Sequence, residues 1–188
     1  MAEGVAPRVR RRDGGGGHGV AVPAPLTGRV VPLDQVPDPV FAERMVGDGA
    51  AVLPEDGQVV APLAGTVTAL FPTGHAVGLR TDEGLELLIH VGIDSAHAEG
   101  VFAALVRVGD RVRPGQPLIR ADLGRLAAAA RSVLSPVVVT NLDERAGRIA
   151  EPARGPVRAG RDVLFRVVWA EPAPAPEGRG STLSRGRG

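Results

Sequence analysis

The sequence predicts an all-β fold: an antiparallel β-sandwich, or a barrel-like version of one, with a duplicated hairpin motif and one or two short helices. Short apolar runs alternate with turn signals at intervals of about 8 to 12 residues. Two segments echo each other, APLTGRVVPL at 24–33 and APLAGTVTAL at 61–70. A second echo links VGDRVRPGQPLI at 108–119 with GPVRAGRDVLF at 155–165. Internal similarity of this kind indicates a repeated β-hairpin unit.

Residues 20–170 are expected to form a single folded domain between two disordered tails. The arm at 1–19 contains RVRRR and GGGGHG, and the tail at 171–188 is rich in Pro and Gly, so neither has the apolar side chains that a core needs. His18, inside the arm, is predicted to be an unconstrained solvent histidine.

Only two segments have helical character. The run DLGRLAAAARSVL at 122–134 places Leu123, Leu126, Ala127 and Ala130 on one stripe, and Pro136 follows it. The run PDPVFAERMVG at 37–47 could hold one further short turn of helix. All the remaining elements are expected to be strands.

The composition excludes several classes of function. The chain has no cysteine, which rules out disulfides, thiolate metal sites and thiol nucleophiles. It has no lysine, which rules out biotinyl or lipoyl carrier domains of similar β-sandwich construction. A formal charge of +1 with four Phe, one Trp and no Tyr does not favour nucleic-acid binding. No apolar run approaches the 18 or so residues of a membrane span, so a cytoplasmic protein without stable membrane insertion is expected.

The segment ELLIHVGID at 86–94 alternates with a period of two and predicts a strand with one buried face. Its apolar side begins at Leu85, and His90, Gly92 and Asp94 fall on the opposite, open face. The glycine is expected to leave room for a ligand beside the histidine. His90 therefore becomes a candidate functional residue.

A second histidine, His75, begins the extended run HAVGLRT, and Asp82-Glu83-Gly84 can connect this run to the first one as a hairpin. A two-residue turn through Glu83-Gly84 would place His75 opposite Gly92 and diagonal to His90, at roughly 7 to 8 Å. A three-residue turn would turn His75 to the other face, because a slip of one residue reverses the alternation. The sequence leaves this register open.

Two neighbouring imidazoles suit a zinc site, acid/base chemistry or phosphoryl transfer through phosphohistidine. A zinc hydrolase would need a third ligand, for which only His97 is at hand, and neither HExxH nor HxH occurs. Phosphoryl transfer is better served, with His90 as nucleophile, His75 as donor to the phosphoryl oxygens and Thr73 as the hydroxyl that fixes His75.

Four runs of the chain form a recognisable pattern: VPDPVFAERMVGDGAAVLP at 36–54, VVAPLAGTVTALFPTGHAVGL at 59–79, ELLIHVGID at 86–94 and LSPVVVTNLDE at 134–144. In these runs the chain resembles a known family, the glucose-type IIA components of the bacterial phosphoenolpyruvate-dependent sugar phosphotransferase system. The resemblance runs from about Ala24 to Val168. It identifies 20–170 as an IIA-type phosphocarrier domain, a phosphotransferase component that needs no cofactor.

What the resemblance implies is a relay of phosphate. The residue matching His90 accepts a phosphoryl group from a histidine-phosphorylated carrier protein and passes it to a cysteine on a IIB domain of a sugar permease. The residues matching His75 and Thr73 stabilise the group, and those matching Asp38 and Asp94 meet an arginine of the donor. An apolar ring surrounds the site, and it matches Val40, Phe41, Met45, Val46, Phe71, Leu88 and Ala96.

Some positions depart from the family pattern. The segment AEGVFAAL at 98–105, His97, Gly78, Pro39 and Ala96 all differ, so a smaller or flatter ring is expected. Two alternatives remain open: a zinc-dependent hydrolase of a related β-sandwich fold, and a regulatory binding module that is never phosphorylated. Zinc held by His75 and His90 in a complex with a partner is a further expectation. Plain core roles for Phe41, Met45 and Val46 also remain open.

Overall fold

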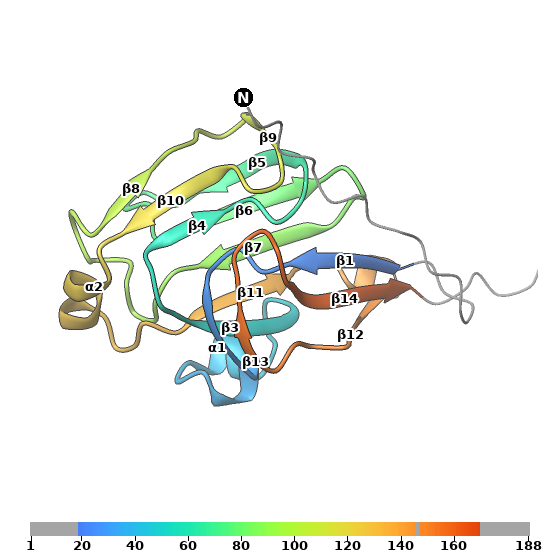
Figure 1. Ribbon diagram of the computed structural model, residues 1–188, viewed down its shortest axis with the longest axis horizontal. Helices are drawn as coiled ribbons and strands as arrows, with labels where there is room; N and C mark the ends of the chain where they lie inside the picture. Colours follow the sequence, from blue (N-terminus) through green and yellow to red (C-terminus); the bar gives the residue numbers. More distant parts are fainter. Residues whose placement is uncertain (1–18, 146, 170–188) are drawn as a thin grey trace, which may run out of the picture.

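The computed structural model describes residues 19–145 and 147–169, and strands dominate it (Figure 1). In chain order the strands are β1 Gly19–Pro23, β2 Gly28–Val31, β3 Asp48–Pro54, β4 Gln58–Val60, β5 Gly65–Leu70, β6 Ala76–Thr81, β7 Glu86–His90, β8 Phe102–Ala104, β9 Arg111–Val112, β10 Pro117–Ala121, β11 Ser135–Val139, β12 Gly147–Ala150, β13 Gly155–Val157 and β14 Val163–Trp169. The expected arm and tail lie outside the described residues, His18 included, except that Gly19 already pairs with Val168.

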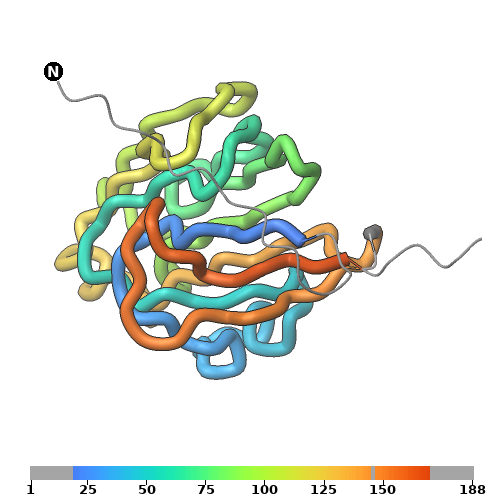
Figure 2. The backbone as a smooth tube through the Cα atoms, turned by 45° about the vertical axis from the view of Figure 1, so that its right-hand side comes forward, coloured from blue at the N-terminus to red at the C-terminus, as the bar shows by residue number. Residues whose placement is uncertain are grey.

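All pairings between these strands are antiparallel. The large sheet has the order β13-β2-β3-β11-β7-β6-β5-β9, and two three-stranded sheets have the orders β1-β14-β12 and β4-β10-β8. The small sheets lie over one face of the large sheet (Figures 1 and 2). Between the layers, residues such as Val52, Ile89, Ile119 and Phe165 form one fully buried cluster. The prediction of an antiparallel β-sandwich is thus confirmed.

The duplicated hairpin motif is also confirmed, and it extends to the whole sandwich. Read from its two edges, the large sheet gives β13-β2-β3-β11 and β9-β5-β6-β7, and the small sheets correspond in the same way. We call β4–β10 the histidine half, and β1–β3 with β11–β14 the counterpart half. In sequence, β2 matches β5 through the two APLxG segments that predicted the repeat.

The strand pairings fix which residues correspond. Gly28 pairs with Pro54, and its equivalent Gly65 pairs with Thr81. Asp48 stands six residues before Pro54, and His75 stands six residues before Thr81. The pairs Gly49–Val138 and Ala76–His90 are equivalent in the same frame. His75 and His90 therefore have Asp48 and Val138 as their counterparts.

The β6–β7 hairpin corrects the expected register. Ala76 pairs with His90 and Arg80 with Glu86, so the turn has three residues, Asp82-Glu83-Gly84, and the two-residue alternative is wrong. The Thr81 N–H donates to the Leu85 carbonyl, and Gly84 adopts a φ of +83°.

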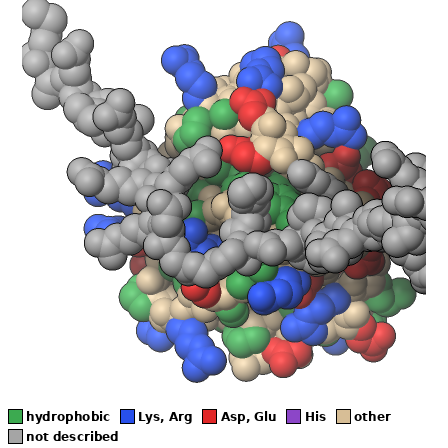
Figure 3. Space-filling model, turned by 90° about the vertical axis from the view of Figure 1, so that its right-hand side faces the viewer, with side chains coloured by type: hydrophobic (Ala, Val, Ile, Leu, Met, Phe, Trp, Pro, Cys, Tyr) green, Lys and Arg blue, Asp and Glu red, His purple; other side chains and the backbone are tan. Residues whose placement is uncertain are grey.

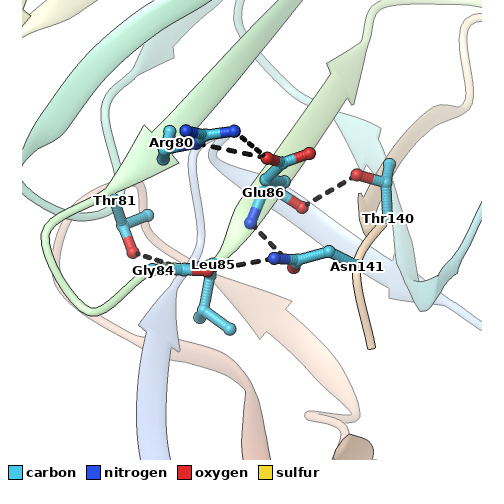
Figure 4. Close-up of polar contacts among 7 residues, drawn as sticks. All are labelled: Arg80, Thr81, Gly84, Leu85, Glu86, Thr140 and Asn141. Carbon is cyan, nitrogen blue, oxygen red and sulfur yellow. Dashed lines mark hydrogen bonds and ion pairs between the residues drawn. The ribbon is translucent and has the colours of Figure 1, made fainter. Parts of the chain in front are cut away.

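Asn141, which follows β11, holds this turn in place (Figure 4). Its side-chain oxygen accepts from the Glu86 N–H, and its side-chain nitrogen donates to the Gly84 carbonyl. The same three-residue turn is expected to move His75 away from His90, yet the two rings are adjacent. The reason is that His75 precedes β6, so strand alternation does not govern it.

The two helices are shorter than the apolar patterns suggest. α1 spans Pro39–Ala42 and α2 spans Leu123–Ala129, so α2 ends before the expected limit at 134. Of the expected stripe only Leu126 is buried, while Ala127 is exposed and Leu123 and Ala130 are half-buried. Asp38 and Asp122 cap the two helices by accepting backbone N–H groups.

A second, smaller core lies on the other face of the large sheet. Its buried members are Leu33, Val36, Phe41, Ala51, Ile93 and Val138. The segment with the 3-10 turn Leu33–Gln35 and α1 covers β3 and β11 there. This small core brings α1 alongside the end of β7, where His90 stands.

Charge is spread evenly over the surface that can be seen. On the described part of the face in Figure 3, arginine and acidic side chains are interspersed and form no basic stripe. The ion pairs Arg44–Asp48, Arg80–Glu86, Arg111–Asp82, Arg158–Asp162 and Arg166–Glu151 are all at least partly exposed. Such pairs contribute little to stability.

Candidate functional site

His90 is the last residue of β7, and its ring is fixed by a backbone carbonyl. Its Nδ1 lies 2.7 Å from the carbonyl oxygen of Gly92. A carbonyl can only accept a hydrogen bond, so in the neutral ring Nδ1 carries the proton and Nε2 keeps its lone pair. Burial lowers the pKa of His90 below its usual range, opposed by this hydrogen bond and by the charge of Asp38. The ring is therefore neutral, with an available nitrogen, near pH 7.

His75 is buried and stands just before β6, where Gly74 turns the chain with a φ of +80°. Its Nδ1 lies 2.6 Å from Thr73 Oγ1. Burial, with smaller contributions from the neighbouring His90 and His97, lowers the pKa of His75 to about 4. Both imidazoles at the site are consequently uncharged under physiological conditions.

The two rings meet edge to face within an aromatic surround. The centroids of His75 and His90 are 4.9 Å apart at an interplanar angle of 70°. Phe41 lies 5.3 Å from His90, while Phe71 and Phe102 lie 5.4 Å and 6.3 Å from His75. Apolar rings on both sides limit the contact of the pair with water, although His90 is only half-buried and Phe71 is exposed.

Phe102 is missing from the residues predicted for the site. It begins β8 in the segment where this chain departs from the family pattern. The alternation of β6 and β7 gives no signal for it, because β8 pairs with β10 in a different sheet.

Gly92 serves a different purpose from the one expected. β7 ends at His90, and Gly92 is buried with a φ of +77°. A Cβ there would lie 3.0 Å from Leu126 Cδ1 and 3.2 Å from the Ser132 carbonyl, so the missing side chain leaves room for packing and not for a ligand. Its contribution to the site is the carbonyl that orients His90.

The residues of the predicted apolar ring divide into two groups. Phe41 is buried in the small core, with Val46 and Leu88 packed partly buried against it. Val40, Met45, Phe71 and Ala96 are exposed, and Met45 keeps 69% of its surface accessible. Phe41 thus combines a core role with contact to His90, whereas Met45 has no core role.

The two predicted acidic residues occupy different settings. Asp38 is half-buried, and its Oδ1 accepts from the Val40 N–H at 2.8 Å. Asp94 is exposed, with a φ of +55°, a left-handed conformation that Asp tolerates better than most residues. Their role in docking stays a prediction.

Gly78 does not leave a hole in the ring. A Cβ there would lie 3.1 Å from Ala69 Cβ and 3.2 Å from Thr68 Oγ1, both at the bulge of β5. These two side chains already fill the space that a larger residue at 78 would occupy. Gly78 itself is buried, so the expected smaller or flatter ring stays a prediction.

No group of three or more His, Cys, Asp or Glu side chains is placed to hold a metal ion in the part of the chain that the structure describes. The exposed His97 therefore does not complete a three-ligand set with His75 and His90. A hydrolytic zinc site would need such a set.

Comparison with known proteins points to one family. Residues 20–145 match the family model described as phosphoenolpyruvate-dependent sugar phosphotransferase system, EIIA 1. The chain belongs to this family. The PTS system glucose-specific EIIA component of Staphylococcus aureus (strain COL) is 48% identical over 128 residues, which cover 68% of this chain and 77% of that one.

Two further relatives agree with this. A PTS system glucose-specific EIICBA component of Staphylococcus saprophyticus is 50% identical over 127 residues, 67% of this chain and 19% of that one. The solved structure of glucose permease IIA from Mycoplasma capricolum aligns with a TM-score of 0.74 at 34% identity, covering 79% of this chain and 96% of that one. The chain is thus a phosphocarrier component of the sugar phosphotransferase system. Neither α1 nor α2 has the length and apolarity to cross a membrane, and they are the only α-helices in the described ranges.

Proposed function

We propose that His90 is the residue that carries the phosphoryl group, as a transient phosphohistidine. The observation behind this is the hydrogen bond from His90 Nδ1 to the Gly92 carbonyl, which leaves Nε2 as the nucleophilic nitrogen. The lowered pKa of His90 keeps that nitrogen unprotonated at neutral pH. The aromatic rings of Phe41, Phe71 and Phe102 around the pair reduce competing attack by water on the phosphorylated form.

The proposed transfer balances as two in-line displacements. In the first, the Nε2 lone pair attacks the phosphorus of a phosphohistidine on the donor carrier protein, and the donor nitrogen leaves with the electrons of its N–P bond. In the second, a cysteine thiolate on a IIB domain attacks the phosphorus, and His90 recovers its lone pair. Positioning and charge stabilisation carry most of the catalysis in such steps.

His75 and Thr73 are proposed to stabilise the charge of the group in transit. If the Thr73 hydroxyl donates to His75 Nδ1 across their 2.6 Å contact, then Nε2 of His75 carries a proton. With ring centroids 4.9 Å apart, that proton can be donated to an oxygen of a phosphoryl group on His90. A neutral donor held in place without reorganisation favours the transition state.

The surface around the pair is proposed as the docking site for both partners. The exposed Phe71 lies against His75, and the exposed Val40 stands in α1 beside Phe41, which contacts His90. Met45 is exposed shortly after α1, and Asp38 is close enough to His90 for its charge to raise the pKa of that histidine against the effect of burial. An apolar patch with a polar centre suits partners that bind and leave in turn. The relative named EIICBA supports a IIB domain as the acceptor.

The test is mass spectrometry of the protein after incubation with phosphoenolpyruvate and the donor carrier proteins of the system. We expect a gain of one phosphoryl group that acid removes, and no gain in His90→Gln. His97→Gln, which changes an exposed histidine nearby, serves as the matched control and should be phosphorylated normally. Labelling that survives His90→Gln would refute the assignment. No labelling of the parent protein would favour the purely regulatory module.

Two expectations remain as proposals. We place the protein in the cytoplasm, where its partners would present their phosphorylated groups. Zinc could be bound by the Nε2 atoms of His75 and His90 in a complex whose partner completes a tetrahedral ligand set. Metal analysis of the isolated chain and of its complexes, each with and without His75→Gln, would test the second proposal.

A further inference from the structure

All the backbone polar groups of the two peptide units around Gly92 are hydrogen-bonded. Two peptide units flank this residue, and each contributes one N–H and one carbonyl. The Gly92 N–H donates to Ser135 Oγ at 3.3 Å, and the Val91 carbonyl accepts from Ser95 Oγ at 2.7 Å. These two bonds take up both polar groups of the first unit.

The second unit is bound in the same way. The Ile93 N–H donates to the Ser132 carbonyl at 2.7 Å, and the Gly92 carbonyl receives the proton of His90 Nδ1 at 2.7 Å. Of the four groups, three are thus held by Ser95 and the segment 132–135, and the fourth is the one that orients His90.

Both serine side chains are fully buried, with 0% of their surface accessible. A hydroxyl in such a place lowers stability unless it is hydrogen-bonded. Ser135 uses both of its capacities, because it accepts from Gly92 and donates to the Val133 carbonyl at 3.0 Å. The chain thus connects the loop between α2 and β11 to the ring of His90 through a short series of bonds.

We propose that Ser135 and Ser95 are positioning residues for phosphoryl transfer, because they fix the peptides around Gly92 and so hold His90 with its proton on Nδ1 and Nε2 available. The inference rests on the proposed function of His90. Neither serine contacts the transferred group. They act through the Gly92 carbonyl, in the way that outer hydrogen bonds fix the tautomer of a reactive histidine.

The tautomer of His90 can be read directly from imidazole ¹⁵N chemical shifts in a two-dimensional NMR spectrum at pH 8. In the parent protein we expect Nδ1 protonated. In Ser135→Ala and in Ser95→Ala we expect the Nε2-protonated form to appear as a substantial population, together with at least a tenfold slower phosphorylation of His90. Ser135→Thr, which keeps the hydroxyl, should restore both readouts toward the parent values.

Thr81→Val is the matched control. Thr81 is also buried, and its hydroxyl also accepts from a backbone N–H, that of Leu85, but it stands at the far end of the β6–β7 hairpin (Figure 4). It should lose stability much as Ser135→Ala does while leaving the tautomer of His90 unchanged. If Ser135→Ala does not fold, Ser95→Ala carries the test.

Folded serine variants in which the tautomer and the rate are both unchanged would overturn the proposal. So would slower transfer with an unchanged tautomer, because the serines would then be merely structural. The tautomer measurement needs no phosphate. If the parent protein is never phosphorylated but the serine variants still change the tautomer of His90, the proposed function is refuted. The positioning role of the serines then still stands.

Discussion

The two halves of this sandwich share a backbone plan, but only one of them carries the pair of histidines that we propose for phosphoryl transfer. In the histidine half, His75 and His90 meet beside aromatic rings. In the counterpart half, the same two places hold Asp48 and Val138. The Asp48 carboxylate accepts from Arg44 Nε and from the Gly49 N–H, and Val138 is fully buried. The Asp48 carboxylate is therefore hydrogen-bonded within its own neighbourhood, and Val138 has no polar side-chain atom. Neither of the two positions offers a nucleophile comparable to His90.

A glycine with positive φ precedes the first of these places in both halves. Gly74 precedes His75 and Gly47 precedes Asp48, both with positive φ, at +80° and +136°. After the second strand the halves diverge, because Gly92 has Thr140 as its counterpart. What distinguishes the histidine half is therefore the pair of imidazoles together with the serine-bound turn after β7. The repeated fold supplies two equivalent positions, and under the proposed function their side chains decide which one can accept the phosphoryl group.

The largest effect is expected when the histidine half receives the counterpart's residue. His75→Asp should slow phosphorylation of His90 on the order of 1000-fold, because a carboxylate would repel the incoming group and remove a donor. His75→Gln, which keeps a neutral donor, should cost about tenfold and should affect onward transfer most. Quench-flow measurement of acid-labile phosphate gives both rates.

Equal rates for His75→Asp and His75→Gln would show that the charge at this place is irrelevant. The reactive half would then differ from its counterpart by His90 alone. Circular dichroism and urea unfolding of both variants would establish that each is folded when the rates are compared.

The sequence is sufficient to predict the fold class and the repeat, and it singles out His75 and His90 as candidate site residues. The APLxG echo and the alternation of 86–90 are patterns of residues close together in the chain, so they can be read directly from the sequence. The turn length of the β6–β7 hairpin is not local, because Asn141 from after β11 holds the turn. Phe102 and Ser135 reach the site from other strands, and no periodicity near His90 reports on them.

The equivalent glycines give the next largest effect, now on stability. Gly47→Ala should lower the free energy of unfolding by about 3 kcal/mol, since its Cβ would lie 2.3 Å from the Val139 carbonyl oxygen. Gly74→Ala should lower it by about 1 kcal/mol, as its nearest neighbour is Phe102 Cβ at 3.3 Å. Urea unfolding measures both.

The order of the two variants should be reversed for the rate of phosphoryl transfer: Gly74→Ala, which loses less stability, should lose more of the rate. Gly74→Ala pushes on Phe102 and on the turn that carries His75, so it should slow transfer, whereas folded Gly47→Ala should transfer normally. Slower transfer in Gly47→Ala alone would mean that the counterpart half takes part in the chemistry.

The pH dependence of stability comes next in size, and it should arise from the histidine half. The pKa of His75 is about 4 in the folded protein, below the usual 6.5. Between these values the unfolded chain takes up a proton that the folded chain does not, so stability is lost as the pH falls through that range. From pH 7 to pH 5, His75→Gln should lose on the order of 1 kcal/mol less than the parent. Urea unfolding at both pH values measures this, and an equal loss of the free energy of unfolding in the two proteins would contradict the prediction.

The smallest effect is expected for the ion pair that occupies the counterpart site. Arg44 and Asp48 form a 2.8 Å contact, but their side chains are 50% and 35% exposed, so water and salt screen the attraction. Arg44→Ala should therefore change the free energy of unfolding by about 0.5 kcal/mol or less, and 1 M salt should abolish the difference. It should leave phosphorylation of His90 unchanged. A larger loss of stability that persists in 1 M salt would mean that the Arg44–Asp48 pair contributes substantially to the stability of the counterpart half.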